Sequence, residues 1–379
     1  MAVSAARAWI SPLSAWQRRW RDLRNRLLAN GAFQDWAARF PLTRFVARRE
    51  ARALFDLCAG FVYSQTLAAC VELDLFALLA AGAEPLDRLA ARCRLAPAAM
   101  LRLVRAGAAL RLLETDGARV ALGPLGAALL ANPGIAAMVR HHALLYRDLA
   151  DPVGLLRGET DPALAGFWPY EGGDAPRAEA YSRLMAASQP MVAAGILAAW
   201  NFRRHRRILD VGGGDGRFLE AVAARAPDLE LMLFDLPDVA ELARARFARA
   251  GLAGRAGAPA RAYGGDMRAD RLPEGADIAT LVRVLHDHDD DDAMAILRNV
   301  RACLQPGATL LIAEPLAAAA GAAPVGDAYF GFYLLAMGRG RARREAELVA
   351  MAERAGFIEA RQIATPQPLL TGLIAARAG

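Results

Sequence analysis

A short apolar run that leads directly into a glycine-rich loop constrains this chain more than any other part of its sequence. The run Ile208–Val211 precedes Gly212-Gly-Gly-Asp-Gly216, and a segment with helical periodicity follows from Arg217. Glycine is favoured where the backbone turns sharply and approaches a ligand without a Cβ in the way. This order predicts the first strand, loop and helix of a doubly wound α/β domain that binds its ligand at the carboxyl ends of the strands.

Further apolar runs alternate with segments of helical periodicity after residue 207. These runs are Leu229–Phe234, Ala276–Val282 and Thr309–Ala313. Continuous apolar runs are typical of parallel strands that are buried on both faces. We therefore expect a Rossmann-like domain over residues 201–379.

The spacing of the glycines indicates which nucleotide the domain binds. Glycines at 212, 214 and 216 give GxGxG, whereas the dinucleotide fingerprint GxGxxG needs a glycine where Arg217 stands. The spacing favours S-adenosylmethionine over a nicotinamide dinucleotide. For the loop taken alone, the alternative is a tight turn between strand and helix that binds nothing.

Acidic side chains follow the next two strands in the same way. Asp235 lies roughly 20 residues beyond the loop, where this architecture binds ribose hydroxyls through a carboxylate. Asp266 and Met267 follow Gly264-Gly265 and suit the amino group and the ring face of an adenine. Three such signals in order predict a cofactor site more strongly than the glycine loop alone.

Candidate catalytic residues follow the last two of these strands. His286 stands at a strand end, and an imidazole with an ordinary pKa near 6.5 accepts a proton at neutral pH. Glu314 ends the next strand and faces the same crevice. His288 precedes a run of four aspartates and fits a histidine on the surface of an acidic helix N-terminus.

The first 52 residues form a basic amphipathic arm. They hold 11 arginines and 3 acidic residues, 11 − 3 = +8, while the whole chain is +6. Trp16, Trp20, Leu23 and Leu27 recur at helical spacing, with arginines on the intervening face. Such a helix suits the headgroup region of an anionic bilayer. The alternative is a dimerisation arm whose tryptophans pack on a partner subunit.

The residues from 53 to 200 are predicted to be mainly helical, with a winged helix near their start. Helices over Pro85–Ala91 and Ala98–Leu110 precede a hairpin over Leu112–Leu122. The second helix offers only Arg102 and Arg105 to read base edges, which is too few for a DNA-binding role. We interpret this part as a dimerisation domain that also closes a pocket.

The cysteines and the apolar stretches bear on localisation. The four cysteines, Cys58, Cys70, Cys93 and Cys303, show no ligand or disulfide spacing, so we expect buried free thiols in a reducing cytoplasm and no bound metal. Residues 1–20 lack an apolar signal core, and charged residues interrupt Thr66–Ala83 and Leu310–Met337. We expect a cytoplasmic protein with peripheral contact to the inner membrane through its arm.

An aromatic stripe follows Glu314. Tyr329, Phe332, Tyr333 and Met337 recur at helical spacing within Asp327–Met337. Such a stripe forms either ordinary core or an apolar wall beside the reactive end of the crevice.

Six short motifs together carry a family resemblance. They are Asp210-Val-Gly-Gly-Gly214, Phe234-Asp-Leu-Pro237, Gly265-Asp-Met267, Leu285-His-Asp287, Ala313-Glu-Pro315 and Ala355-Gly-Phe357. In this order they resemble the S-adenosylmethionine-dependent O-methyltransferases that include the plant caffeate and flavonoid enzymes and acetylserotonin O-methyltransferase. The resemblance covers most of the chain, because this family also has an N-terminal winged-helix dimerisation domain.

The resemblance implies a homodimer and a role for each matching residue. Asp235 would bind ribose, and Asp266 and Met267 would flank adenine. His286 would be the general base, oriented by Glu314. The cofactor set also includes Gly212, Gly214 and Arg283.

The chain departs from the family's pattern at two positions. Arg283 stands where plant members often have lysine, and Ala342 stands where a second glutamate beside the base is expected. Asp287 is the candidate substitute for that glutamate.

Three segments look most like the bacterial carotenoid methylases, the hydroxyneurosporene or demethylspheroidene O-methyltransferases. They are Phe55–Gln65, Met185–Pro190 and Gly326–Gly340. This narrower resemblance implies methylation of the 1-hydroxyl of an acyclic carotenoid, with Met185 and the aromatic stripe at the acceptor. The alternatives are a methylase of small phenols or polyketides and a non-catalytic winged-helix regulator, against which the intact His286 argues.

Overall fold

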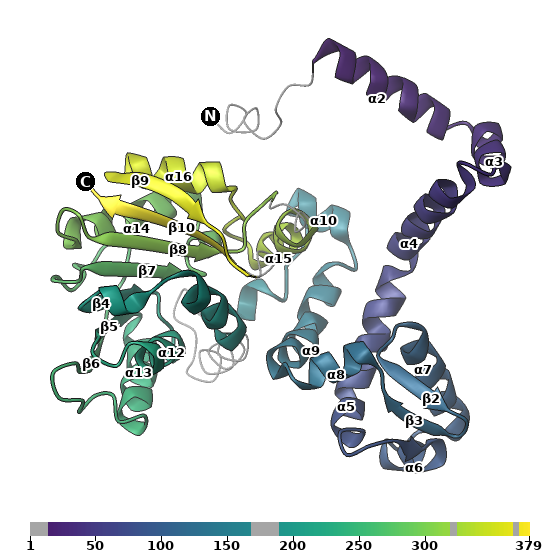
Figure 1. The fold of residues 1–379 in the computed structure, drawn as a ribbon, viewed down its shortest axis with the longest axis horizontal. Coiled ribbons are helices and arrows are strands. Elements are labelled where there is room, and N and C mark those ends of the chain that lie inside the picture. The colour runs from purple at the N-terminus through teal and green to yellow at the C-terminus, as the bar shows by residue number, and fades with distance from the viewer. Residues whose placement is uncertain (1–13, 168–188, 319–323, 367–370) are drawn as a thin grey trace.

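A mostly parallel seven-stranded sheet forms the centre of the C-terminal half. The computed structural model describes residues 14–167, 189–318, 324–366 and 371–379. The strand order is β6-β5-β4-β7-β8-β10-β9, and only β10 runs antiparallel to its neighbours (Figure 1). The strands are β4 (Arg207–Val211), β5 (Glu230–Asp235), β6 (Ala260–Gly264), β7 (Ile278–Val282), β8 (Thr309–Glu314), β9 (Phe357–Ile363) and β10 (Gly372–Ala378).

Helices cover both faces of this sheet, as a doubly wound domain requires. They are α12 (Arg217–Arg225), α13 (Pro237–Arg249), α14 (Asp290–Cys303) and α16 (Glu345–Arg354). Phe218 of α12 and Phe247 of α13 pack in the core on one face, while Leu297 of α14 and Met351 of α16 pack in the core on the other. The chain leaves β4 in one direction to β5 and β6 and in the other to β7 and β8, which places a ligand crevice at the carboxyl ends of these strands.

The expected α/β class is confirmed, and so are its predicted runs, which form β4, β5, β7 and β8. β9 and β10 were not predicted. Most of β9 is exposed at the sheet edge, and β10 is rich in alanine, so neither has the apolar pattern of a buried parallel strand.

The winged helix is present in the N-terminal half. Its elements are α6 (Leu86–Arg92), α7 (Pro97–Ala109), β2 (Leu113–Asp116) and β3 (Arg119–Leu122), and the short strand β1 (Glu84–Pro85) adds to β3. Both predicted helices and the hairpin agree with these bounds to within a residue or so. Met100, Val104 and Leu113 are buried in the core of this unit together with α5 (Leu75–Leu78).

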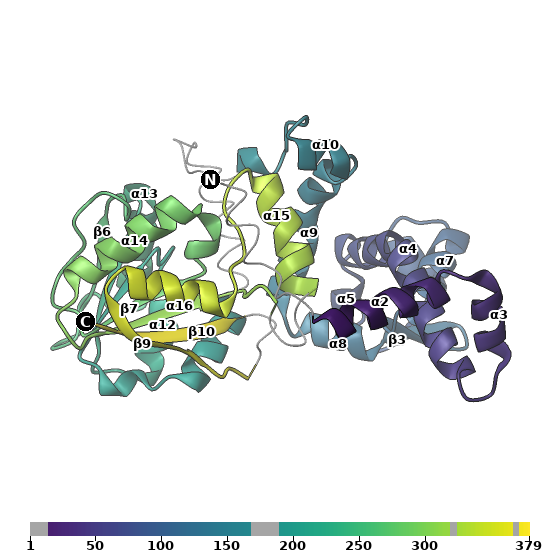
Figure 2. The same ribbon diagram turned by 90° about the horizontal axis from the view of Figure 1, so that it is seen from above.

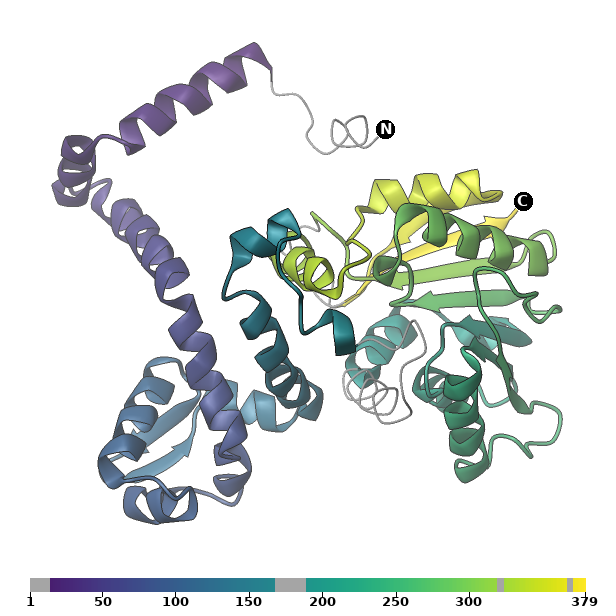
Figure 3. The same cartoon turned by 180° about the vertical axis from the view of Figure 1, so that it is seen from behind.

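Three projecting helices precede the winged helix. They are α2 (Ala15–Leu28), α3 (Gly31–Arg39) and the long helix α4 (Arg44–Glu72), which begins in the arm and ends beyond residue 52. Figure 3 shows α4 leading away from the winged helix toward α3 and α2. No residue of α2 is buried, and Trp16, Leu42 and Leu57 are 71%, 74% and 81% exposed. These helices therefore present apolar side chains that this single chain does not cover.

Helix α4 is the one helix in the described part of the chain that is long and apolar enough to cross a membrane. Only 11% of its apolar window is buried. Helices packed in a core or between two copies meet the same criterion, so length and composition alone do not assign α4 to a bilayer. One prediction about this helix is wrong: Cys58, expected to be buried, is exposed on it.

A helical connection joins the two halves. It includes α8 (Pro124–Leu130), α9 (Pro133–Asp148), α10 (Pro152–Arg157) and the short 3₁₀ turns η2 (Ala165–Phe167) and η3 (Phe202–Arg204). Figure 2 shows α9 and α10 beside α15 (Phe330–Met337), a helix of the C-terminal half. The connection therefore contacts the segment that carries the aromatic stripe.

Candidate active site

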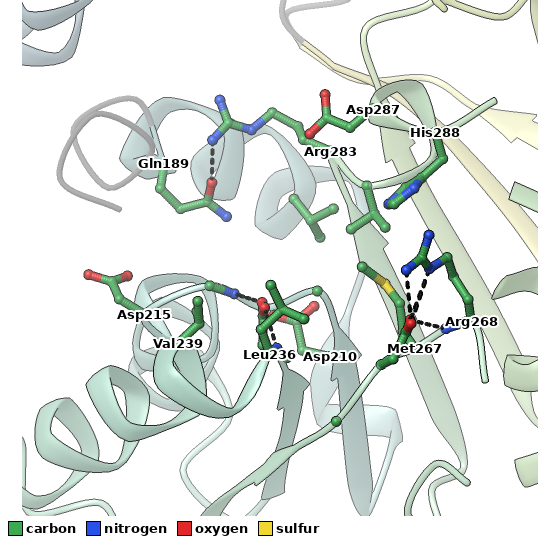
Figure 4. Close-up of a pocket in the computed structure, with 18 of the residues that line it drawn as sticks. Gln189, Asp210, Asp215, Leu236, Val239, Met267, Arg268, Arg283, Asp287 and His288 are labelled. Atoms are coloured by element: carbon green, nitrogen blue, oxygen red, sulfur yellow. Dashed lines mark hydrogen bonds and ion pairs between the residues drawn. The ribbon is translucent and has the colours of Figure 1, made fainter. Parts of the chain in front are cut away.

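A pocket opens at the carboxyl ends of β4, β5, β6 and β7. Figure 4 shows Asp215 and Leu236 on one side of it and Met267, Arg268 and His288 on the other. The glycines of the loop at 212–214 also line it. Gln189, which precedes β4, closes it from above in this view. The pocket lies where the order of parallel strands reverses, as expected for a nucleotide ligand.

The glycine loop needs its glycines for backbone conformation and for space. Gly212 and Gly214 have φ of +72° and +59°, in the left-handed region that favours glycine. A Cβ on Gly212 would lie 2.6 Å from a methyl of Val284. The loop therefore brings its backbone close to the pocket without side chains in between.

Asp235 holds this loop and faces the pocket. Its Oδ2 accepts a 2.8 Å hydrogen bond from the Gly214 N–H, and its Oδ1 accepts a 2.8 Å bond from the Leu236 N–H. Burial raises the pKa of Asp235 to about 6, although these two N–H donors oppose the shift. Each oxygen keeps further acceptor capacity, so the carboxylate can receive two hydroxyl donors from the pocket.

Asp210 is a second buried carboxyl group beside the loop. Thr280 Oγ1 donates to its Oδ1 over 2.6 Å. Burial raises the pKa of Asp210 to about 7, and the nearby charge of Asp235 adds to the rise. The pocket thus contains two carboxyl groups that titrate near neutral pH.

The predicted adenine end contains Asp266 and Met267. The carboxylate of Asp266 pairs with Arg268 at 2.9 Å, and this contact holds the pKa of Asp266 below its usual range. Met267 lines the pocket. His288 lines it too and is only 4% exposed, so its interpretation as a surface histidine is wrong. The aspartates after it do form the first turn of α14, but the pocket wall buries the imidazole.

Arg283 follows β7 and also lines the pocket. Its φ is +57°, a conformation that non-glycine residues rarely adopt. Its Nη2 donates to Gln189 Oε1 over 3.2 Å. This contact ties the segment before β4 to the pocket rim, as Figure 4 shows.

His286 lies on the 3₁₀ turn η4 (Leu285–Asp287), directly beside the pocket. Its Nδ1 contacts Glu314 Oε2, and Glu314 Oε1 accepts hydrogen bonds from the N–H groups of Val284 and Leu285 at 2.9 and 2.7 Å. Burial alone would lower the pKa of His286, but the charges of Asp287 and Glu314 outweigh burial and raise it. The imidazole is thus buried and in contact with Glu314, which is the arrangement expected of a candidate base.

Asp287 lies on the opposite side of the ring. Its Oδ1 is 3.1 Å from His286 Nε2, while Ala342, at the position of the expected second glutamate, is buried and offers no carboxylate. Arg343, next to Ala342, is fully buried and was not predicted to take part. An arginine in a basic run is usually read as a solvated side chain, so only the fold could identify it.

The aromatic stripe begins in a π-helix, η5 (Pro324–Tyr329), and continues in α15. Phe330 makes an edge-to-face contact with His286 at 5.9 Å between ring centroids, and it also contacts Tyr329 and Tyr333. Tyr333 and Met337 are buried in a cluster with leucines of α9 and α10, whereas Phe332 is half-buried. Phe330, which lies alongside the stripe, therefore connects Tyr329 and Tyr333 to the candidate base.

Two histidines of α9 bind the tyrosines of this stripe, and sequence reasoning missed both. The ring Nε2 atoms of His141 and His142 lie 2.8 Å from the hydroxyls of Tyr333 and Tyr329. Burial lowers the pKa of His141 to about 4. Their adjacency in a partly apolar helix was the available signal, but it does not specify a partner.

Two predictions about the site remain, the acceptor residue Met185 and the absence of a bound metal. Met185 lies outside the described residues. Within the ranges that the structure describes, no group of three or more His, Cys, Asp or Glu side chains is arranged to hold a metal ion.

The pocket, the buried His–Glu pair and the strand order together fit a methyl-transfer enzyme that uses a nucleotide-containing methyl donor. The O-methyltransferase domain model matches residues 146–358, and the O-methyltransferase dimerisation domain matches residues 55–132. The chain belongs to the S-adenosylmethionine-dependent O-methyltransferase family, and S-adenosylmethionine is its methyl donor. The dimerisation domain supports a homodimer that acts on a small molecule.

Two curated relatives are similar along nearly the whole chain. The demethylspheroidene O-methyltransferase of Cereibacter sphaeroides is 46% identical over 93% of this chain and 93% of its own length. That of Rhodobacter capsulatus is 44% identical over 90% of this chain and 86% of its own length. Among solved structures, the methyltransferase CalO1 of calicheamicin biosynthesis with bound S-adenosylhomocysteine has a TM-score of 0.74 and 25% identity, covering 87% of this chain and 98% of its own.

Proposed function

We propose that this enzyme transfers the methyl group of S-adenosylmethionine to the 1-hydroxyl of an acyclic carotenoid. The 44 and 46% identity with two demethylspheroidene O-methyltransferases over at least nine-tenths of the chain carries the proposal. The aromatic stripe beside His286 supports it, because a flat, rigid polyene packs well against aromatic rings.

His286 acts as the general base in this proposal. When bound, S-adenosylmethionine supplies an electrophilic methyl carbon on a sulfonium. His286 Nε2 would accept the proton of the acceptor hydroxyl, whose oxygen would take the methyl carbon as the carbon–sulfur bond breaks and S-adenosylhomocysteine leaves. Glu314 holds the opposite nitrogen of the ring. Asp287, 3.1 Å from Nε2, stabilises the imidazolium that results. The apolar ring of Phe330 beside His286 would suit a transfer in which the sulfonium becomes a neutral thioether.

The residues that line the pocket would hold the cofactor. Asp235 would accept the ribose hydroxyls, Met267 would pack on the adenine face, and Asp266 would bind the adenine amino group. The close backbone of Gly212 and Gly214 gives the cofactor room. Arg283, tied to Gln189, closes the rim above it. Alignment of the two substrates is the main contribution, which reaches about 7 to 11 kcal/mol in well-oriented reactions.

The class of acceptor is tested by offering one candidate substrate at a time. Purified enzyme with methyl-labelled S-adenosylmethionine receives a 1-hydroxylated acyclic carotenoid in detergent micelles, the 1-deoxy analogue, or a small phenol. We expect label only in the hydroxylated carotenoid. Faster labelling of the phenol would replace the carotenoid with the alternative acceptor class, and no labelling of any acceptor while cofactor still binds would favour a regulatory role.

The acceptor wall consists of the stripe residues in this proposal. Tyr329, Phe332, Tyr333 and Met337 would line it together with Met185. Phe332 is half-buried, and the structure shows no side-chain hydrogen bond for it, whereas the equally half-buried Tyr329 binds His142. It is therefore the position at which acceptor binding can be separated from folding.

The enzyme is proposed to be cytoplasmic and to contact the membrane surface through its arm. Trp16 and Trp20 stack at 6.5 Å between ring centroids and are both exposed, and helix α2 carries arginines on its other positions. Exposed tryptophans flanked by arginines suit an anionic interface, and a carotenoid acceptor is itself dissolved in the bilayer.

Deletion of residues 1–50 tests the membrane contact. We expect weaker co-sedimentation with vesicles that contain phosphatidylglycerol, with the dimer retained on gel filtration. A monomeric product with unchanged vesicle binding would assign the arm to the partner subunit instead.

The proposed division of the chain is an arm (1–52), a dimerisation and pocket-closing domain (53–200) and a catalytic domain (201–379). Helix α4 runs from Arg44 to Glu72 without a break, so it connects the first two parts rigidly. Its exposed apolar residues Phe55, Leu57 and Phe61 are within the matched dimerisation domain and are proposed to face the partner.

A further inference from the structure

The buried side chain of Arg343 forms hydrogen bonds with both ends of the turn that carries His286. Its Nη1 donates to the carbonyl of Leu285 over 2.5 Å, and its Nη2 donates to the carbonyl of His288 over 2.8 Å. Nε and Nη2 also bind Asp290 Oδ1 at 3.1 and 2.8 Å. A guanidinium is planar and rigid, so it sets the separation of the two carbonyls that flank His286 and Asp287.

Glu314 holds the same turn from the other side. Its carboxylate accepts the N–H groups of Val284 and Leu285, while Arg343 takes the carbonyls of Leu285 and His288. The peptide groups of the turn are thus fixed at both their donor and their acceptor ends. This arrangement limits the movement of the imidazole relative to the cofactor pocket.

The segment that supplies Arg343 also packs directly on this turn. Gly340 has φ of +80°, and a Cβ there would lie 2.7 Å from the carbonyl carbon of Asp287. Its N–H donates to Asp289 Oδ1 over 2.9 Å. The fit is therefore close enough that a single added carbon would displace the turn.

Burial of a guanidinium is an expensive way to stabilise a fold. The side chain of Arg343 is 1% exposed, and burial lowers its pKa. Replacing buried ion pairs with apolar side chains of similar volume is often neutral or stabilising. Fold stability alone gives little reason for a buried arginine here, whereas its directed hydrogen bonds fix the turn in place.

We propose that Arg343 is a positioning residue for His286, and that together with Glu314 it holds the turn that carries His286 from both sides. This inference rests on the proposed role of His286 as the base, and it does not depend on which acceptor is methylated. Arg343 acts through the turn and does not touch the substrates.

Single-turnover methyl transfer at saturating S-adenosylmethionine and acceptor, measured from pH 5.5 to 9, tests the proposal. We expect Arg343→Met to slow the step about 10- to 100-fold, since misplacement by about 1 Å costs on the order of a hundredfold. The pH at which the rate is half-maximal should move upward in this variant. Removal of the cation near Glu314 leaves more negative charge beside His286, which raises the pKa of the imidazole. Arg343→Lys should restore this pH and part of the rate.

Arg341→Met is the matched control. Arg341 also binds Asp290, at 3.1 Å, but it pairs with Glu347 at the surface and is 31% exposed. We expect its single-turnover rate to stay within about threefold of the original enzyme. The pH at which that rate is half-maximal should stay within about 0.2 units. An equal loss in both variants, or an unchanged rate in Arg343→Met, would overturn the proposal.

Two further variants decide the matter if Arg343→Met does not fold. Gly340→Ala displaces the turn without removing the guanidinium of Arg343, so it should slow methyl transfer. Original rates in folded Gly340→Ala and Arg343→Lys would refute the positioning role. Separately, an unchanged rate in His286→Ala would refute the role of His286 itself, which distinguishes failure of the proposed function from failure of this inference.

Discussion

The carboxylate of Asp235 offers the most direct test of the cofactor site. Each of its oxygens already accepts one backbone N–H, from Gly214 or Leu236, and retains acceptor capacity toward the pocket. In the proposed complex the two ribose hydroxyls occupy that capacity. Asp235→Ala therefore removes two hydrogen bonds to a charged group and also one anchor of the glycine loop.

The size of the effect follows from these contacts. Hydrogen bonds to charged groups contribute about 1.5 to 3 kcal/mol each, so losing two costs about 3 kcal/mol at the lower end. This corresponds to roughly a hundredfold weaker binding. The free-energy change is measured by isothermal titration calorimetry with S-adenosylhomocysteine, which binds without turnover.

The pH dependence of binding provides a second signature. The pKa of Asp235 is raised to about 6, and hydroxyl donors require its ionised form. Affinity should therefore be constant well above pH 6 and fall by up to tenfold for each pH unit below it. Asp210 titrates nearby, so the contribution of Asp235 is the difference between the curves of the original enzyme and Asp235→Ala.

Asp238→Ala is the control for loss of charge. Asp238 is exposed in the first turn of α13 and does not line the pocket. It should bind S-adenosylhomocysteine with unchanged affinity. An Asp235→Ala affinity within threefold of the original, or equal losses in the two variants, would refute the assignment of Asp235 to the ribose.

Three further outcomes are expected. His286→Ala should lower turnover at least about a hundredfold while cofactor affinity measured by calorimetry is unchanged, and near-normal turnover would remove His286 from the mechanism. Phe332→Ala should raise the Michaelis constant for a hydroxylated carotenoid with little change in melting temperature; a large thermal loss without that effect would make Phe332 a core residue. His141 stays neutral in the folded protein down to about pH 4, whereas the unfolded chain binds its proton near pH 6.5. Stability to urea should therefore decrease as pH falls from 6.5 to 4, and less so in His141→Asn; equal slopes would exclude His141 as the cause.

The cofactor half of the site was predictable from the sequence because its chemistry is local to strand ends. A buried strand followed by glycines or an acid places those residues at the crevice whatever the rest of the chain does. Gly212, Asp235, Met267 and the turn of His286 are accordingly close to where the pattern put them.

The other contacts depend on segments that meet only in the folded chain. Arg343 reaches Leu285 across 58 positions, and His141 reaches Tyr333 across 192. No spacing rule connects such residues, because their partners are set by how the helices pack. His288 was misjudged for the same reason: the sequence shows its acidic neighbours but not the pocket wall that buries it.

The hydrogen bonds from α9 to the tyrosines of the stripe have an evolutionary consequence. The cofactor pocket is built almost wholly from loops of the β-sheet domain, whereas the stripe is supported by a helix that precedes that domain. With the stripe as the proposed acceptor wall, mutations in α9 would alter which acceptor fits while the methyl-donor machinery is left intact. Directed evolution for a new acceptor would then best begin at His141 and His142.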